Sequence, residues 1–356
     1  MNFSEQFPIL KEYTYLNTAN SGLLAVNVAN WRRNHDVNFI EGGSEFRANS
    51  HHVFEALRGN FSESFGVKNS NVFLNPNFSI GFHSVLNGLS KNHRVLLLAD
   101  EYPSLSYPVK SFGFDYLEVA IDQDFEYNII KSIEEFKPTI FAFSFVQYIS
   151  GLQMQSNFIK ELRSTFPELI LIADGTQFLG TSRFSFIDSG LDALIGSGYK
   201  WLLGGYGNGY IFLSDRIKEK LYQNRQSALL PNAPFLSGRD HLSLNLEPGH
   251  LDSMNFGTLN QGLLYLKGIG FDKIEQDVKH LSSLARTELA KKGFIPEWMN
   301  ERIEQSPIIS LPLNQDQVNQ LNGAKILASP RGTGTRISFH LYNNENDLDR
   351  LLAVLA

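Results

Sequence analysis

The amino-acid sequence predicts an α/β fold, in which a large, mainly parallel sheet is covered by helices and a smaller α+β part follows. The first observation is a series of apolar runs of strand length, at residues 72–74, 94–99, 116–119, 139–144, 169–173, 193–195 and 210–213. The second is that helical patterns separate several of these runs, at residues 79–89, 127–135 and 157–165. Near-continuous apolar strands that alternate with helices are typical of a parallel sheet buried on both faces.

The pattern changes after Arg216. The glycine-rich stretch 204–209 is consistent with a tight connection into an antiparallel last strand. Beyond it come a loop-rich stretch at 226–250, an amphipathic pattern at 261–292 that breaks near 268–270 and stops at Gly293, strands at 308–311 and 336–340, and a helix from Glu345. We therefore expect a large domain at residues 15–250 and a small α+β domain at 251–356, with residues 1–14 packed nearby.

Composition excludes several classes of protein. The chain has 356 residues, of which 42% are hydrophobic and 12% aromatic, which is ample for a sizeable core. A net charge of -6 provides no basic surface for nucleic acid. The N-terminus lacks the apolar core of a signal peptide, and the longest apolar runs are too short to span a bilayer. We expect a cytoplasmic protein with no nucleic-acid or membrane partner.

The chain has no cysteine, which excludes disulfides, thiolate metal sites and thiol nucleophiles. The adjacent histidines His51 and His52 lack the spacing of metal ligands on a helix. We therefore expect no metal site.

Two strand ends carry the residues that point to chemistry. Asp174 ends the run at 169–173, and ligands of parallel α/β sheets gather at the carboxyl ends of strands. Lys200 follows the run at 193–195, where apolar surroundings favour the neutral amine that attacks a carbonyl carbon. Each residue also has an ordinary interpretation, because aspartate often caps a turn and an isolated lysine usually extends to solvent.

Taken together, the segments 174–177 (Asp-Gly-Thr-Gln) and 197–200 (Ser-Gly-Tyr-Lys) resemble the class V aminotransferase family of fold-type I enzymes that use pyridoxal 5′-phosphate (PLP). The resemblance extends over most of the chain. It implies that Lys200 holds PLP as a Schiff base and that Asp174 pairs with the pyridine nitrogen. It also implies that Gln177 hydrogen-bonds the phenolic oxygen of the cofactor, and that Ser197 and Tyr199 lie on its phosphate side.

The resemblance implies three further contacts with the cofactor. Phe78 and Ser79 begin a predicted helix, whose backbone N–H groups suit a phosphate, although simple helix capping explains them equally well. Tyr102 matches the ring that stacks on the pyridine, in a segment that is also a good generic turn. Thr258 matches a loop that reaches the cofactor phosphate of a partner subunit, which implies an obligate homodimer with a shared active site.

Substrate contacts are implied near both ends of the chain. Arg336 matches the arginine that binds the substrate α-carboxylate, and Arg331 is the alternative. An ordinary surface arginine at a strand start remains the other interpretation. Asn20 lies in a segment that resembles the N-terminal lining of the substrate pocket.

The absence of cysteine narrows the reaction. A cysteine desulfurase of the usual mechanism needs a thiol to accept sulfur, and this chain has none. We expect an aminotransferase that acts on an amino acid, and possibly on a 2-oxo acid, with Lys200 moving the proton. The alternatives are a C–S or C–Se lyase, an epimerase, a kynureninase-like enzyme, a non-catalytic binding protein of the same fold, and a generic nucleotide-binding α/β enzyme.

Overall fold

The structure of the protein is a computed structural model that describes residues 3–355. Its strands are β1 (Thr14–Tyr15), β2 (Val72–Asn75), β3 (Arg94–Leu98), β4 (Asp115–Val119), β5 (Ile140–Ser144), β6 (Ile170–Asp174), β7 (Ala193–Ser197), β8 (Gly209–Leu213), β9 (Ile308–Leu311), β10 (Ile326–Leu327), β11 (Ser329–Arg331) and β12 (Gly334–Ser338). Its helices are α1 (Val26–Asn49), α2 (His51–Phe65), α3 (Phe78–Gly88), α4 (Pro103–Ser111), α5 (Phe125–Phe136), α6 (Ser156–Thr165), α7 (Asp215–Lys218), α8 (His241–Leu246), α9 (Ser253–Ile269), α10 (Phe271–Lys291), α11 (Glu297–Asn300), α12 (Gln315–Gly323) and α13 (Glu345–Val354).

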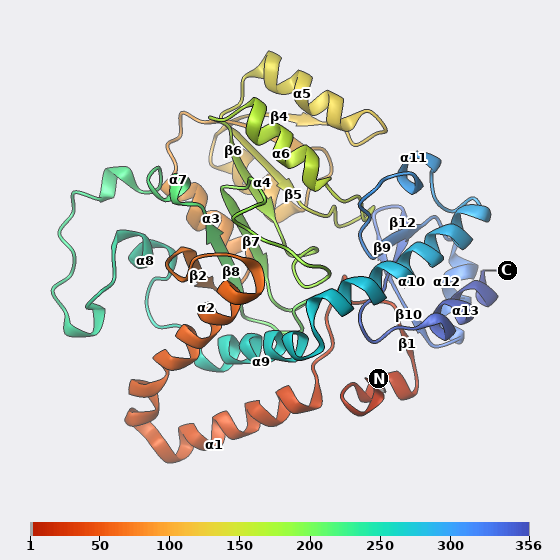
Figure 1. The fold of residues 1–356 in the computed structure, drawn as a ribbon, viewed down its shortest axis with the longest axis horizontal. Helices are drawn as coiled ribbons and strands as arrows, with labels where there is room; N and C mark the ends of the chain where they lie inside the picture. Colours follow the sequence, from red (N-terminus) through yellow and green to blue (C-terminus); the bar gives the residue numbers. More distant parts are fainter. Residues whose placement is uncertain (1–2, 356) are drawn as a thin grey trace.

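A seven-stranded sheet forms the centre of the molecule (Figure 1), with the strand order β2-β8-β7-β6-β5-β3-β4. The pairs from β7 through β6, β5 and β3 to β4 are parallel, whereas β8 runs antiparallel to both β7 and β2. All seven predicted strands are therefore present, and the antiparallel direction allowed for the last one is the observed direction. The predicted α/β fold class is confirmed.

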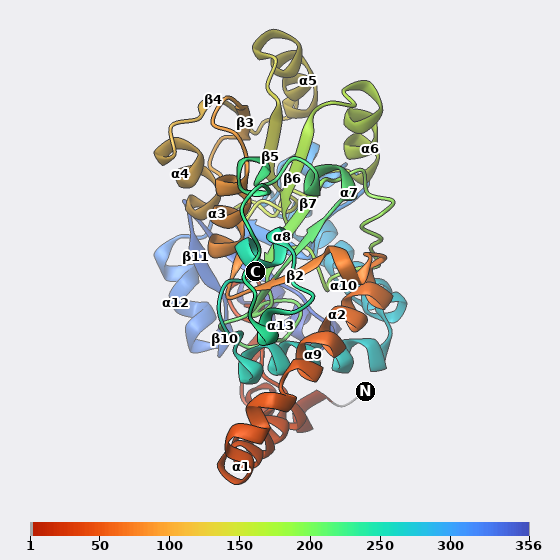
Figure 2. The same cartoon turned by 90° about the vertical axis from the view of Figure 1, so that its left-hand side faces the viewer.

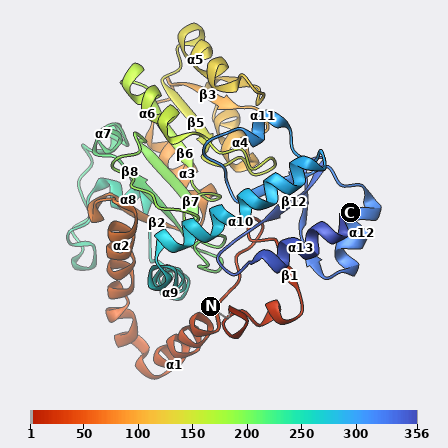
Figure 3. The same ribbon diagram turned by 45° about the vertical axis from the view of Figure 1, so that its right-hand side comes forward.

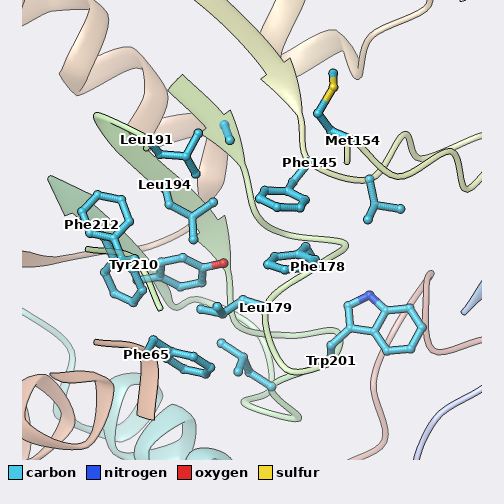
Figure 4. Packing of buried hydrophobic residues seen from close by; sticks show 14 of the residues in the cluster. Phe65, Phe145, Met154, Phe178, Leu179, Leu191, Leu194, Trp201, Tyr210 and Phe212 are labelled. Atoms are coloured by element: carbon cyan, nitrogen blue, oxygen red, sulfur yellow. The ribbon is translucent and has the colours of Figure 1, made fainter. Parts of the chain in front are cut away.

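Helices cover both faces of this sheet (Figure 2), and the alternation of side chains along each strand explains why. In β3, Leu96 and Leu98 join one apolar cluster together with residues of α5 and α6. Val95 and Leu97 point the other way, into a second cluster with residues of α3 and α4. Because both faces are buried, successive positions in the middle of most of these strands are apolar, which is the pattern visible in the sequence; β4, whose residues are mostly exposed, is the exception. Figure 4 shows part of the first cluster.

A smaller α+β part contains the three-stranded sheet β11-β12-β9, packed with α10 and α13. Figure 3 shows α10 running from α9 toward this sheet. The N-terminal segment joins the same part, because β1 pairs in parallel with β10. The predicted division at residue 250 stays a prediction. α9 begins soon after that residue and packs along α1 and α2.

Several helices differ from the expectations. Those that were not predicted include α1, α2, α8 and α12, as well as α4, which starts in a segment for which a turn was the alternative interpretation. α9 begins at Ser253, well before the expected start near residue 261, because the Asp252 side chain accepts a hydrogen bond from the Asn255 backbone N–H and caps the helix. Thr258 therefore lies inside a helix, and the predicted loop at this position was wrong.

No helix within residues 3–355 is both long enough and apolar enough to cross a bilayer. The predicted cytoplasmic location stays a prediction.

Candidate active site

Polar side chains gather where three neighbouring parallel strands end. Ser144 is the last residue of β5, Asp174 of β6 and Ser197 of β7. Ser144 pairs with Asp174 in the sheet register, so the two side chains emerge at the same edge. This edge is where α/β sheets bind their ligands.

A cavity of about 210 Å³ lies at this edge. Its walls contain most of the predicted cofactor-side residues, together with several that sequence reasoning missed. The lining residues are Asn77, Phe78, Ser79, Tyr102, Ser144, Val146, Tyr148, Asp174, Thr176, Gln177, Ser197, Tyr199 and Lys200. Of the residues predicted for the site, Asn20, Thr258, Arg331 and Arg336 are not in the lining.

Lys200 is a buried amine, with 9% of its surface exposed. Burial lowers the pKa of Lys200, the positive charge of Arg336 lowers it further, and Asp174 opposes both effects. Within residues 3–355, no carboxylate lies within 4.0 Å of its amino group. A buried amine without an ion-pair partner favours its neutral form, which is the nucleophilic form.

Asp174 is a buried carboxylate facing the same cavity. Burial raises the pKa of Asp174, whereas hydrogen bonds from Thr176 and the charge of Lys200 lower it. One of these bonds joins the Thr176 backbone N–H to Asp174 Oδ1 at 2.8 Å. The carboxylate thus lacks a cationic partner in contact with it, and a cationic ligand group would stabilise its charged form.

The N-terminus of α3 supplies hydrogen-bond donors at another part of the wall. Ser197 Oγ accepts a bond from the Phe78 N–H at 2.9 Å, and the Ser197 N–H donates to Thr176 Oγ1 at 3.1 Å. Within residues 3–355, neither the N–H nor the hydroxyl of Ser79 has a hydrogen-bond partner. Free N–H groups at the start of a helix, flanked by serine hydroxyls, are suited to an anion such as phosphate.

Gln177 fixes the segments on either side of the cavity. Its Nε2 donates to the Ala19 carbonyl at 2.8 Å, and its Oε1 accepts from Trp201 Nε1 at 3.0 Å. The first bond holds the N-terminal segment, and the second holds the residue that follows Lys200. One N–H of the Gln177 amide remains for a ligand in the cavity.

Three tyrosines, Tyr102, Tyr148 and Tyr199, belong to the lining. The Tyr199 ring stacks on Tyr206, with ring centroids 4.9 Å apart, and burial raises the pKa of Tyr199 to about 12. Its hydroxyl therefore stays protonated and can donate a hydrogen bond. Tyr102 contacts Tyr148 edge to face, with centroids 5.2 Å apart.

Two arginines lie behind the lining. Arg336 has only 2% of its surface exposed, and its Nη1 donates to the Tyr148 carbonyl at 2.5 Å. Burial lowers the pKa of Arg336 to about 10, with Arg331 adding to the effect. Arg331 Nη2 donates to Asn20 Oδ1 at 2.7 Å. The charge of each arginine also lowers the pKa of Lys200, so both guanidinium groups act on the cavity.

Thr258 is the predicted cofactor-binding residue that lies outside the cavity wall. Its hydroxyl donates to the Met254 carbonyl at 2.7 Å and accepts a bond from Arg32 Nη1 at 3.0 Å. Its expected role toward the phosphate of a partner subunit stays a prediction.

Comparison with known proteins identifies the family. The family model "Aminotransferase class-V" matches residues 27–351. The chain belongs to the class V aminotransferases. Members of this family use PLP, so the predicted cofactor and the predicted resemblance are confirmed, and the protein is a PLP-dependent enzyme of class V.

Two curated relatives of this chain have names that imply different activities. One is a probable cysteine desulfurase from Ureaplasma parvum, 22% identical over 88% of this chain and 84% of the relative. The other is an uncharacterised aminotransferase from Schizosaccharomyces pombe, 27% identical over 72% of this chain and 69% of the relative.

Solved structures of similar proteins share the fold. The cystine C–S lyase C-DES, solved as a mutant with glycine linked to its PLP cofactor, matches with a TM-score of 0.86 at 17% identity, over 99% of this chain and 98% of that chain. A cysteine desulfurase from Thermococcus onnurineus matches with a TM-score of 0.82 at 16% identity, over 99% of this chain and 96% of that chain.

The cavity of the class V aminotransferase fits this cofactor. PLP carries an aldehyde, a pyridine nitrogen and a phosphate, and each needs a different partner. The cavity provides a buried amine at Lys200, a buried carboxylate at Asp174 and unpartnered donors at Ser79.

Proposed function

We propose that the protein is a PLP-dependent aminotransferase that acts on an α-amino acid through Lys200. The observation that carries the proposal is the pair formed by Lys200 and Asp174. Both are buried in one cavity, and among residues 3–355 neither has an ion-pair partner in contact with it. A structural role would leave the cost of burying these two groups uncompensated, whereas a cofactor with an aldehyde and a basic nitrogen satisfies both.

Residues of the wall would hold the cofactor at its aldehyde carbon, its pyridine nitrogen and its phosphate. Lys200 would bind its aldehyde carbon, and the Asp174 carboxylate would accept the N–H of its protonated pyridine. Ser79, Ser197 and Tyr199 would donate hydrogen bonds to the phosphate. When bound, the protonated ring supplies an electron sink for the charge that develops at the substrate Cα.

Two more residues of the wall would contact the cofactor, and an arginine behind the wall would bind the substrate. Gln177 would donate to the phenolic oxygen of the cofactor, and the Tyr102 ring would lie against the pyridine. Arg336 would bind the substrate α-carboxylate. This contact would orient the substrate and so determine which bond at Cα points toward the Lys200 amine. Asn20 would lie on the same side of the substrate, because its side chain accepts a hydrogen bond from Arg331.

Once the amino group of the substrate had displaced Lys200 from the aldehyde carbon of the cofactor, the freed lysine amine would act as the base and acid of the reaction. Its neutral amine would take the proton from the substrate Cα and return it at C4′ of the cofactor. The lowered pKa of Lys200 supports this role, because it keeps the amine able to accept a proton near neutral pH.

A second candidate is a C–S lyase that releases its product without a thiol acceptor. Two observations favour it, namely the similarity in fold to a cystine C–S lyase and the absence of cysteine in this chain. The same absence argues against a thiol-dependent desulfurase, the activity in the name of the Ureaplasma relative.

We also propose that the enzyme is a homodimer. Helix α1 exposes apolar side chains at Val37, Phe39 and Ile40, the last with 83% of its surface accessible. Burying these side chains against a second copy would remove apolar area from water.

Incubating the PLP-loaded enzyme with single amino acids tests the reaction type. An aminotransferase would release the 2-oxo acid of the substrate and retain its nitrogen on the cofactor, until an added 2-oxo acid took that nitrogen up. Release of ammonia with pyruvate would instead indicate the lyase, and a racemised substrate an epimerase. Alanine released from kynurenine would indicate kynureninase-like cleavage. No turnover with any amino acid, with PLP bound, would indicate a non-catalytic binding protein.

A further inference from the structure

Two arginines project from the same face of a tight hairpin. β11 and β12 pair antiparallel, with Arg336 opposite Ser329 and Arg331 opposite Gly334. Residues paired across strands share a face, and so do residues two apart along a strand. Arg331 and Arg336 therefore stand on one face in diagonal positions, where backbones are about 7–8 Å apart.

Neither guanidinium has an acidic partner. Among the ion pairs within residues 3–355, none contains Arg331 or Arg336, whereas the part-buried Arg58 pairs with the buried carboxylate of Glu247 at 2.7 Å. Two unpaired positive charges on one face repel each other, and each lowers the pKa of the neighbouring Lys200. Placing these two unpaired charges together raises the free energy of the fold unless anions bind them.

A missing acid is not sufficient by itself, and Arg286 shows why. Arg286 is also buried without an acidic partner, but its Nη2 donates to two backbone carbonyls, those of Ser306 and Ile308. Among residues 3–355, the Arg336 guanidinium makes a single hydrogen bond, to the Tyr148 carbonyl. The buried Nε is unpartnered in both arginines, so the difference between them is the second carbonyl, which Arg286 has and Arg336 lacks. Tyr148 is itself part of the cavity wall.

Different hydrogen-bond partners hold the two guanidinium groups, so that each group is placed separately from the other. Arg336 is bound to the carbonyl of Tyr148, which follows β5, and Arg331 to the side chain of Asn20, which follows β1. The turn between them is fixed as well, because Gly332 has a φ of 57° and a Cβ there would lie 2.8 Å from Ile149. A single carboxylate fills one guanidinium fork through two hydrogen bonds, which leaves the other fork for a second anion.

We infer that the substrate is an α-amino acid with a second carboxylate on its side chain, and that Arg331 binds this second carboxylate. The inference rests on the proposed function, in which Arg336 takes the α-carboxylate. Arg331 is then the residue that determines side-chain specificity, and Asn20 positions it.

Binding of unreactive acids to the PLP-loaded enzyme tests this inference without depending on turnover. Succinate and butyrate have the same four-carbon length and differ by one carboxylate. Calorimetry at fixed ionic strength should show that succinate binds at least about tenfold more tightly, since a hydrogen bond to a charged group is worth a factor of about ten to one hundred. Equal affinities for the two acids would overturn the inference, even if no variant could be purified.

The variant Arg331→Gln tests whether the two arginines bind two separate carboxylates or share one. It should weaken succinate binding by about ten- to one hundredfold and leave butyrate within about threefold of wild type. An equal loss for both acids would mean that the two arginines share one carboxylate, and the inference would be wrong. Arg183→Gln is the matched control, because Arg183 is exposed and pairs with Asp272 at the surface; it should change neither affinity.

Failure of this inference is distinguishable from failure of the proposed function. The function requires a cofactor absorption band that depends on Lys200, whatever acids bind. If that band is present and succinate has no advantage, only the second carboxylate is refuted.

Discussion

Glu101 offers a quantitative test of the electrostatics beneath the site. It is buried between the end of β3 and the end of β5, where its Oε1 accepts the Ser144 N–H at 2.7 Å and its Oε2 accepts the Ser144 hydroxyl at 2.5 Å. Burial raises the pKa of Glu101 to about 7, the hydrogen bonds from Ser144 oppose this, and the charge of Asp174 adds to it. The fold therefore favours the neutral acid relative to the unfolded chain.

The sign and size of the effect follow from linkage. Because the pKa of Glu101 in the folded protein lies above its ordinary value of 4.5, its contribution to stability is fully present below pH 4.5 and is lost as the pH rises through about 7. A rise from 4.5 to about 7 corresponds to about 3 kcal/mol of unfolding free energy. Glu101→Gln keeps the shape of the side chain and removes the titration. The variant should therefore gain stability relative to wild type, by up to about 3 kcal/mol, between pH 4.5 and pH 8.

Urea unfolding of the cofactor-free protein at a series of pH values measures this difference. Subtracting wild type from variant cancels the groups that both share. Glu135→Gln is a suitable control, since Glu135 is exposed on α5 and its replacement should give a flat difference. A difference between Glu101→Gln and wild type that stays constant with pH would refute the reasoning.

Two further predictions concern the loop that contains Lys200 and the proposed homodimer. Gly22 donates its N–H to the Tyr199 carbonyl at 2.9 Å, and a Cβ there would lie 2.0 Å from the Lys200 carbonyl oxygen. Gly22→Ala should therefore cost about 1–3 kcal/mol in urea unfolding and lower the fraction of enzyme that retains PLP; wild-type stability would contradict the close approach. Ile40→Glu should shift the enzyme from dimer to monomer in analytical ultracentrifugation, whereas Tyr127→Glu, at an exposed position on α5, should not. If wild type sediments as a monomer, the proposed interface does not exist.

The central sheet was predictable because most of its strands are buried on both faces, so that their polar residues are confined to the strand ends. Helix α1 was not, since it buries only Val28 and His35 and exposes Phe39 and Ile40, so its pattern has no clear apolar stripe. Helix α4 was not predicted, because Pro103 begins it and Pro108 lies inside it, and a turn was the alternative interpretation of the segment 101–104 where it starts. Proline at the start of a helix is tolerated, and the sequence alone does not separate this case from a turn.

For the site, the strand-end rule drew attention to Asp174, the last residue of β6, and to Lys200, three residues after the end of the neighbouring β7, and the resemblance of the two segments together identified the pair. Glu101 and Ser144 were missed because β3 and β5 are adjacent in the sheet although β4 lies between them in the chain. Strand order is a property of the whole fold, and no local pattern encodes it. Ser144 is the last residue of a predicted strand, and Asp174 directly follows another predicted strand. This place at a strand end was the one signal in the sequence that could have identified Ser144.

The most direct test of the account is the attachment of the cofactor to Lys200. With added PLP, the wild-type enzyme should show an absorption band near about 410–430 nm, and reduction with borohydride should leave the cofactor mass on the peptide that contains Lys200. Lys200→Ala should lose both signals, while Lys160→Ala, at an exposed position on α6, should keep them. A wild-type enzyme without the band, or a Lys200→Ala variant that retains it, would contradict the central claim.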